Sequence, residues 1–493
     1  MSQKTPVSDP PAGWSPRTWG TLVVLCAALF LDALDISMVG VALPSIRGDL
    51  HLSTAQLQWV VSGYVLGYGG LLLLGGRAAD LLGRRRVFLV ALAIFAAASL
   101  FGGLVDSGGL LIASRFLKGI SAAFTAPAGL SIITTTFPEG HSRNRALSIY
   151  SATGASGFSL GLVLSGLLTE IGWRWTFLMP APLALVALVA GARLINRESS
   201  QHLGKRSYDL GGAITGTGAM LLLVYSVTEA PQVGWATART ILSLVAVAAL
   251  MTAFITIEKR TSHPLVRLGI FRNGKVSRAN LAALAFFGSY TAFQFVLTLY
   301  LQTLLNWSAL QTAFALMPSG LIVALLTFGT GAAIDRYGTT RLIVIGFAAM
   351  VVAYALFLRV GSHGAYVSVI LPTVALIGLG AGLAFPSLNI AATNGVHDEE
   401  QGLASGLVNT SLQIGGAIGL AIVTAVVTAG SHGGTTVQDQ LNGYRPALVV
   451  IMAIAAAGLI VGLIATAAER RDARKLRDAV DEAQLLPESV TAE

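Results

Sequence analysis

The sequence predicts an all-α integral membrane protein with fourteen transmembrane helices, arranged as two six-helix halves and two further helices between them. Three observations predict this class. Hydrophobic residues make up 54% of the 493 residues and charged residues 11%, a composition typical of chains that reside in a bilayer. Apolar runs of about 20 residues, long enough to cross a hydrocarbon core as helices, recur along the chain. Short motifs from the first half also recur in the second half at a nearly constant offset.

The expected membrane segments fall into three groups. Six lie in the first half, at 19–42, 56–78, 86–105, 109–136, 144–168 and 174–195. Two follow at 209–229 and 240–257. Six lie in the second half, at 278–304, 309–333, 341–359, 365–388, 404–429 and 446–468. We therefore expect an N-terminal tail at 1–18, a six-helix bundle at 19–195, a linker with two extra helices at 196–275, a second bundle at 276–468 and a C-terminal tail at 469–493.

Basic residues indicate how the chain is oriented. An even number of spans places both termini on one side, and Lys and Arg accumulate on the cytoplasmic side. Most of the 32 basic residues fall in tails and loops on the side of Met1. Only Arg47, Arg174, Arg239, Arg359 and Arg445 fall in loops of the other side. We expect a plasma-membrane protein with both termini in the cytoplasm, whose basic residues face anionic lipid and form no nucleic-acid groove.

Several function classes lack their characteristic residues. The single cysteine, Cys26, cannot form a disulfide within the chain, and the seven histidines fall in expected loops or at helix ends. We find no phosphate-binding loop of the kind that ATP-driven pumps use. The sequence therefore predicts no metal site, no cofactor and no enzymatic activity.

Four charged residues interrupt the apolar segments: Asp32 and Asp35 in the first, and Arg115 and Lys118 in the fourth. A charge at bilayer depth costs roughly 2.5–3.5 kcal/mol, so such residues usually pair or have a function. The first helix runs outward and the fourth inward, which places the four at similar depth. We expect Asp35 to meet Arg115, and Asp32 to meet Lys118.

These pairs are suited to proton coupling. A carboxylate beside a cation stays ionised, whereas the same carboxylate separated from it in a dry pocket binds a proton. A conformational change that separates the pair can therefore take up or release a proton. The alternative is a permanent ion pair that only fixes two helices.

Internal repetition points to a transporter. The frame Gly-x-x-x-Asp-x-x-Gly at Gly76, Asp80 and Gly83 returns at Gly331, Asp335 and Gly338. Further pairs at nearly the same offset are Pro127 with Pro386, Gly157 with Gly415, and Gly161 with Gly419. Two halves built alike around a midplane site are typical of alternating-access transporters.

The same motifs carry a resemblance over roughly residues 19–468. They resemble the major facilitator superfamily, and specifically its fourteen-helix drug:proton antiporter family. The matching stretches are Asp35 to Pro44 in the first helix, the loop 76–86, Arg115 to Gly119 in the fourth helix, and Gly157 to Gly166 in the fifth. Lys118 stands where the family motif has glutamine, and Leu162 and Ser165 replace a proline and a glycine.

The resemblance implies the major facilitator fold, proton coupling through Asp35 and Arg115, and a loop at 76–86 that helps to latch the two halves. In that loop we expect Gly76 and Gly83 to permit a tight turn, Asp80 to cap a helix, and Arg84 to face the inner lipid surface. A purely topological role for the loop arginines is the alternative. A second latch is expected between the acidic cluster 397–400 and Arg143 with Arg145.

The predicted function is proton-coupled export of hydrophobic small molecules, such as antibiotics or secondary metabolites. Uncharged polar residues among apolar ones suit such a site, and we select Tyr64, Gln294 and Asn409 as substrate contacts, with hydrogen bonds between helices as the alternative role. The expected partners are a small hydrophobic substrate, protons and membrane lipid, and the expected state is a monomer. The competing functions are pH-independent uniport or import of a specific nutrient, and a membrane sensor that transports nothing.

Overall fold

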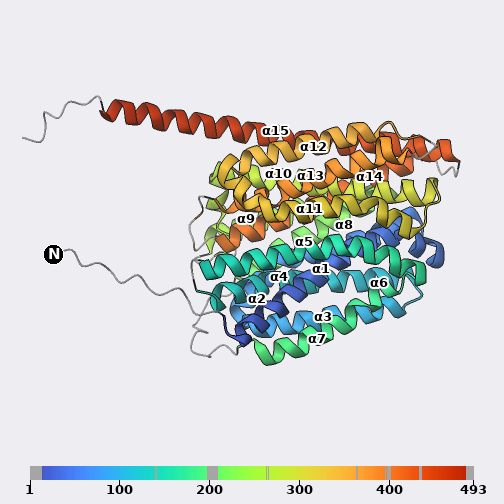
Figure 1. Ribbon diagram of the computed structural model, residues 1–493, viewed down its shortest axis with the longest axis horizontal. Helices are drawn as coiled ribbons and strands as arrows, with labels where there is room; N and C mark the ends of the chain where they lie inside the picture. The colour runs from blue at the N-terminus through green and yellow to red at the C-terminus, as the bar shows by residue number, and fades with distance from the viewer. Residues whose placement is uncertain are drawn as a thin grey trace, which may run out of the picture.

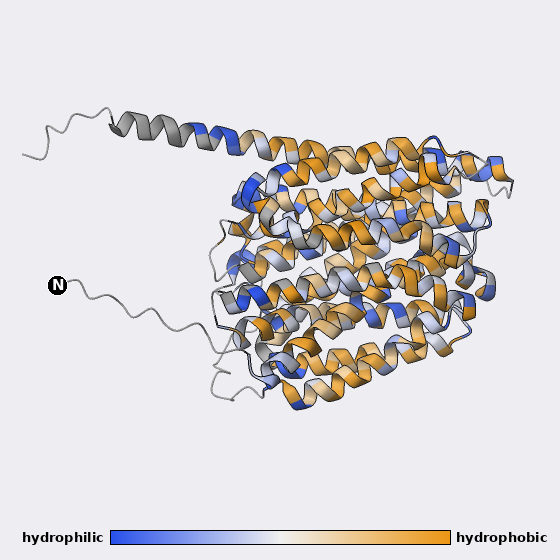
Figure 2. Ribbon diagram, in the orientation of Figure 1, coloured by the Kyte–Doolittle hydropathy of each residue, from blue (hydrophilic) through white to orange (hydrophobic). Residues whose placement is uncertain are grey.

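The computed structural model describes residues 14–138, 141–196, 209–261, 264, 266–361, 365–394, 396, 401–431 and 436–484. These residues form helices and connections, with no strand among them. Figure 1 shows the helices side by side, the first half in blue to green and the second in yellow to red. Hydrophobic residues cover most of their length, whereas hydrophilic residues gather toward their ends (Figure 2).

The first half contains the expected six spans. They are α1 (Pro16–Leu50), α2 (Thr54–Leu82), α3 (Arg84–Leu104), α4 (Gly108–Thr136), α5 (His141–Ile171), and the pair α6 (Trp175–Leu178) and α7 (Pro180–Leu194). The sixth span is divided at Met179 because Pro180, the first residue of α7, has no N–H to continue the hydrogen-bond ladder.

The remaining elements follow the prediction closely. They are α8 (Leu210–Val233), α9 (Ala238–Arg260), η2 (Leu268–Arg272), α10 (Gly274–Leu299), η3 (Tyr300–Leu304), α11 (Ala309–Tyr337), α12 (Thr339–Phe357), η4 (Tyr366–Ile370), α13 (Leu371–Thr393), α14 (Gln401–Ser431) and α15 (Val437–Gln484). In the described part, 13 helices are long and apolar enough to cross a membrane, and α2, with 29 residues, packs among them. The fourteen expected spans are thus present, although α15 continues well past its expected end.

Helix pairing repeats between the halves. In the first half α1 packs along α5 and α2 along α4, and in the second half α10 packs along α14 and α11 along α13. The caps repeat as well. Ser53 and Gln56 form a capping box at the start of α2, and Ser308 and Gln311 form another at the start of α11. The internal repeat read from the sequence is therefore also a repeat of local structure.

We call the end of the bundle at which α1 begins the N-terminal face, and the end at which α1 finishes the opposite face. One hydrophobic cluster joins the second half to the part of α1, α2 and α4 near the opposite face, with Ile46, Leu57 and Leu111 among its members. A separate cluster fills the first half toward the N-terminal face, with Leu25 and Phe88 among its members. The hydrophobic contact between the halves is thus concentrated toward the opposite face.

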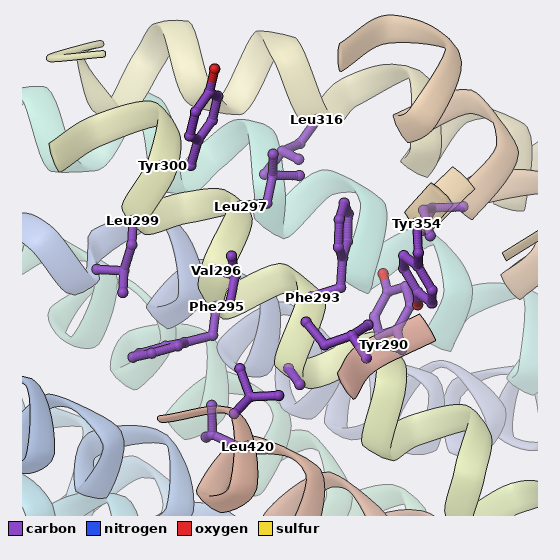
Figure 3. Packing of buried hydrophobic residues seen from close by; sticks show 14 of the residues in the cluster. Tyr290, Phe293, Phe295, Val296, Leu297, Leu299, Tyr300, Leu316, Tyr354 and Leu420 are labelled. Carbon is purple, nitrogen blue, oxygen red and sulfur yellow. The ribbon is translucent and has the colours of Figure 1, made fainter. Parts of the chain in front are cut away.

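Aromatic residues dominate the core of the second half. The rings of Phe293 and Tyr354 lie 4.9 Å apart, and those of Phe293 and Phe357 5.2 Å apart. Figure 3 shows Phe293, Tyr354 and Tyr290 gathered among α10 and its neighbours. Within the described residues this core holds no ion pair like the one found in the first half.

The two inserted helices lie against both halves through α8. This helix packs on α2 and on α14, and α9 packs on α8. Near the opposite face the indole Nε1 of Trp59 on α2 donates a hydrogen bond to Glu229 Oε1 on α8, at 3.0 Å. Side chains of α9, η2, α10 and α14 form a further hydrophobic cluster that includes Phe254, Ile270 and Leu407.

Candidate functional site

The buried charges of α1 and α4 meet in one cluster. Arg115 Nη1 donates to Asp35 Oδ2, and Lys118 Nζ donates to Asp35 Oδ1. Asp35 and Lys118 are 0% exposed and Arg115 is 2% exposed. Both oxygens of one carboxylate therefore hold a cation out of contact with solvent. The expected contact of Asp35 with Arg115 is confirmed.

The expected pairing of Asp32 with Lys118 is wrong. Lys118 binds Asp35, and Asp32 instead accepts a hydrogen bond from Thr125 Oγ1, at 3.1 Å. The long side chain of Lys118 reaches the carboxylate of Asp35, and Thr125, two turns further along α4, takes the place beside Asp32 that Lys118 was expected to fill. Residues seven apart share a helix face, so Lys118 and Thr125 both face α1.

The two cations are surrounded by aromatic rings and carbonyl oxygen. Arg115 Nε donates to the Val60 carbonyl at 3.1 Å, and its guanidinium carbon lies 4.8 Å from the centre of the Tyr64 ring. Lys118 Nζ lies 5.0 Å from the ring centre of Phe95 and 4.9 Å from that of Phe177. Such cation–π contacts stabilise a desolvated charge. Nothing in the sequence pattern predicts that these two phenylalanines lie beside Lys118.

Close helix packing places these side chains. A Cβ atom on Gly119 would lie 2.1 Å from the Tyr64 carbonyl oxygen, so only glycine lets α4 approach α2 this closely. Ser121 Oγ donates to the Ala91 carbonyl at 2.7 Å and ties α4 to α3. The glycine after Lys118 in the fourth-helix motif thus brings Arg115 within reach of α2.

Asp32 has different surroundings from Asp35. It retains 8% exposure, and Thr125 is a neutral partner. Tyr68 on α2 and Tyr150 on α5 lie within electrostatic reach of its carboxylate. The cluster therefore holds one carboxylate saturated by cations and a second that depends on weaker contacts.

The three residues selected for substrate contact lie on α2, α10 and α14. Tyr64 is buried against Arg115, and its hydroxyl has no hydrogen-bond partner among the described residues. Gln294 is half-buried on α10. The side-chain amide of Asn409 donates to the Ser405 carbonyl of its own helix at 2.9 Å. Since α14 packs on both α2 and α10, the three helices adjoin, and the substrate role stays a prediction.

The turn between α2 and α3 has the expected glycine but not the expected cap. Gly83, at φ 91°, closes α2 and precedes α3. Asp80 lies in the last turn of α2, with its side chain outside the described part, and the N-cap position of α3 belongs to Gly83. The cap assignment was wrong because α2 continues two residues past Asp80.

Other members of the predicted latch lie at the N-terminal face. Arg84 Nη1 donates to the Ser131 carbonyl near the end of α4, at 3.3 Å. Gly76 lies where an added Cβ would be 3.8 Å from the Pro127 side chain. In the second half Asp335 is exposed in the last turn of α11. Their role as a latch stays a prediction.

Gly157 and Gly161 hold α5 against α1. A Cβ atom on Gly157 would lie 2.6 Å from the Phe30 carbonyl oxygen, and one on Gly161 would lie 2.8 Å from that of Leu34. The helix α5 runs unbroken through Leu162, where the related motif has proline. These two glycines therefore set the distance between the helices.

The proposed second latch lies partly outside the described residues. The structure does not describe residues 397–400. Arg143 Nη2 donates to the Thr134 carbonyl at 2.8 Å, and the Arg145 guanidinium lies 5.0 Å from the centre of the Trp14 ring.

Comparison with known proteins agrees with this architecture. A family model described as the major facilitator superfamily matches residues 25–420. A puromycin resistance protein of Streptomyces alboniger is 36% identical over 477 residues, covering 92% of this chain and 93% of that protein. A cephamycin export protein of Amycolatopsis lactamdurans is 37% identical over 415 residues, covering 84% of this chain and 85% of that protein.

Solved structures show the same fold at low identity. A structure of proton-dependent oligopeptide transporters aligns with a TM-score of 0.66 and 15% identity, covering 92% of this chain and 100% of that chain. A nucleoside transporter aligns with a TM-score of 0.62 and 13% identity, covering 92% and 99% respectively.

Proposed function

Because the chain belongs to the major facilitator superfamily, we propose that it exports a hydrophobic small molecule in exchange for protons, by alternating access. Membership makes it a multi-pass membrane transporter and not an enzyme. The observation that carries the proposal is the buried cluster of Asp32, Asp35, Arg115 and Lys118 between α1 and α4. Two carboxylates and two cations inside a membrane bundle are costly unless they are used.

The proton is exchanged within this cluster. When the bundles rock, contacts between its carboxylates and cations lengthen or water is removed, and a carboxylate that loses stabilisation binds a proton. When the first contacts return, the proton leaves on the other side. A membrane potential of 100 mV adds about 2.3 kcal/mol for each charge moved inward, which helps to drive a solute outward.

The names of the relatives support the proposed substrate class. Their names record resistance to puromycin and export of cephamycin, so an antibiotic or a secondary metabolite is the proposed cargo. The proposed contacts are Tyr64, Gln294 and Asn409, which supply hydrogen-bonding groups among apolar and aromatic residues. Lipid at the membrane surface is the other partner, and the proposed working unit is a monomer.

The proposed orientation puts the N-terminal face in the cytoplasm of a plasma-membrane protein. It follows from the distribution of basic residues. The hydrophobic contact between the halves toward the opposite face then corresponds to a closed outer gate. The proposed moving bodies are 19–195 and 276–468, the linker is 196–275, and the tails are 1–18 and 469–493. Gly76, Asp80, Gly83, Arg84 and Asp335 at the N-terminal face form the proposed inner latch.

Transport in proteoliposomes tests this function. Purified protein is reconstituted, a pH step is imposed, and uptake of puromycin and a panel of dyes is followed. We expect flux that reverses with the sign of the pH step. Flux that is independent of the pH step would favour uniport, and absence of flux for every compound would favour a membrane sensor.

A further inference from the structure

The two carboxylates of the cluster differ in how they are held. Asp35 has a cation on each oxygen and is fully buried, as are the two cations. A proton that reached Asp35 would need to displace a cation, which would then be left unpaired inside the bundle. The arrangement at Asp35 therefore opposes proton exchange.

Asp32 is held more weakly. Its Thr125 partner has one hydroxyl proton, and that hydroxyl also lies 3.0 Å from the Ser121 carbonyl and 3.3 Å from the Ala122 carbonyl. The donor is thus shared among three acceptors. Asp32 also retains some exposure, whereas Asp35 has none.

The charges of the cluster balance only when Asp32 is ionised. Arg115 and Lys118 contribute two positive charges, of which Asp35 cancels one. Lys118 also acts electrostatically on Asp32. With glutamine in place of Lys118, as in the related motif, the Asp35–Arg115 pair would be neutral by itself and Asp32 would face no remaining cation.

We infer that Asp32 is the carboxylate that exchanges the transported proton, and that Lys118 is a positioning residue that locks Asp35 and sets the pH at which Asp32 is occupied. This inference rests on the proposed proton exchange. It moves the proton from Asp35, the acid that the resemblance associates with coupling, to Asp32.

Few other groups face Asp32. Asp35 is one turn away on α1, and Arg115, Lys118 and Thr125 are on α4. Tyr64 and Tyr68 approach from α2, and Tyr150 approaches from α5. The remaining helices packed on α1 include α7, α10 and α11. Their described charged residues, Arg193, Lys275, Arg278, Asp335 and Arg336, all lie near the N-terminal face. Lys118 is therefore the cation whose removal most directly changes the field at Asp32.

Infrared titration of the purified protein tests this inference without a substrate. The carbonyl stretch of a protonated carboxyl group is followed against pH. We expect one buried group to titrate in the wild type and its band to disappear in Asp32→Asn. Lys118→Gln should move its midpoint up by about one to two pH units, because a nearby positive charge no longer favours the ionised form. Lys118→Arg should keep the midpoint near that of the wild type.

A milder variant guards against misfolding of Lys118→Gln. Thr125→Val keeps all four charges and removes only the hydroxyl donor to Asp32, so it should also raise the midpoint, by a smaller amount. A band that persists in Asp32→Asn, or a midpoint that neither Lys118→Gln nor Thr125→Val moves, would overturn the inference. The vesicle assay is read separately. If the band titrates as expected while the flux is independent of pH, the result contradicts proton-coupled transport. The assignment of Asp32 as the titrating group then still stands.

Discussion

Gly83 and Gly338 adopt the same unusual backbone conformation at equivalent turns of the two halves, with φ of 91° and 81°. Each glycine separates two long helices at the N-terminal face, α2 from α3 and α11 from α12. Residues other than glycine rarely adopt this backbone conformation, because their Cβ atom would come too close to a backbone oxygen. The two turns thus explain why both motif repeats end on glycine.

Replacing either glycine should weaken the fold. Gly83→Ala and Gly338→Ala should each cost about 1–2 kcal/mol of unfolding free energy, since alanine is strained at positive φ. The single cysteine, Cys26, is buried, so a thiol-reactive dye reports thermal unfolding. Gly40→Ala is the matched control, because an added Cβ there meets nothing within 4 Å and the position is helical. Equal melting temperatures for Gly83→Ala, Gly338→Ala and Gly40→Ala would contradict this explanation.

The stability of the protein should also depend on the size of the residues where α5 contacts α1. A Cβ atom on Gly161 would lie 2.0 Å from Ser37 Oγ and 2.8 Å from the Leu34 carbonyl oxygen, so Gly161→Ala must push the helices apart. Overpacking of this kind typically costs about 1–3 kcal/mol. Gly154→Ala on the same helix meets only the flexible side chain of Leu29, at 3.0 Å, and should melt closer to the wild type. The thiol-dye melting curve distinguishes the two, and a Gly161→Ala protein as stable as Gly154→Ala would show that α1 and α5 can separate freely.

The sequence predicted the helices well, because each one is a continuous apolar run of about the length that spans a bilayer and can be recognised without knowledge of its neighbours. It placed Asp35 beside Arg115 correctly, since helix direction and rise determine depth. It could not decide which acid Lys118 meets, because a difference of one helical turn is smaller than the reach of a lysine side chain. The phenylalanines beside Lys118 and the link from Trp59 to Glu229 arise from tertiary packing, and no local pattern contains them. Asp80 was misplaced because α2 extends past it, and helix ends are the least determined feature of an apolar segment.

The hydrogen bond of Trp59 to Glu229 should anchor the inserted helices to the first half. Trp59→Phe and Glu229→Gln should each lower the melting temperature, and a double-mutant cycle should give a coupling of about 1 kcal/mol, as for a half-buried bond to a charged acceptor. Glu229 also lies 3.6 Å from Arg239, so the cycle is needed to separate the two contacts. Trp235→Phe, at an exposed tryptophan, is the control. A coupling energy of zero would mean that α8 is held by apolar packing alone.

Changes to the charge balance around Asp35 should change the melting temperature of the protein. Asp35→Asn leaves Arg115 and Lys118 buried without the carboxylate that binds them both, and breaking a buried ion pair from one side costs about 3–5 kcal/mol. Adding Lys118→Gln to Asp35→Asn removes the surplus positive charge, so the double variant should melt above Asp35→Asn alone. Asp106→Asn is the comparison, because its ion pair with Arg174 is exposed and such pairs contribute at most about 1 kcal/mol. If the double variant melts below Asp35→Asn, Lys118 stabilises the bundle through its contacts with Phe95 and Phe177 more than through its charge on Asp35.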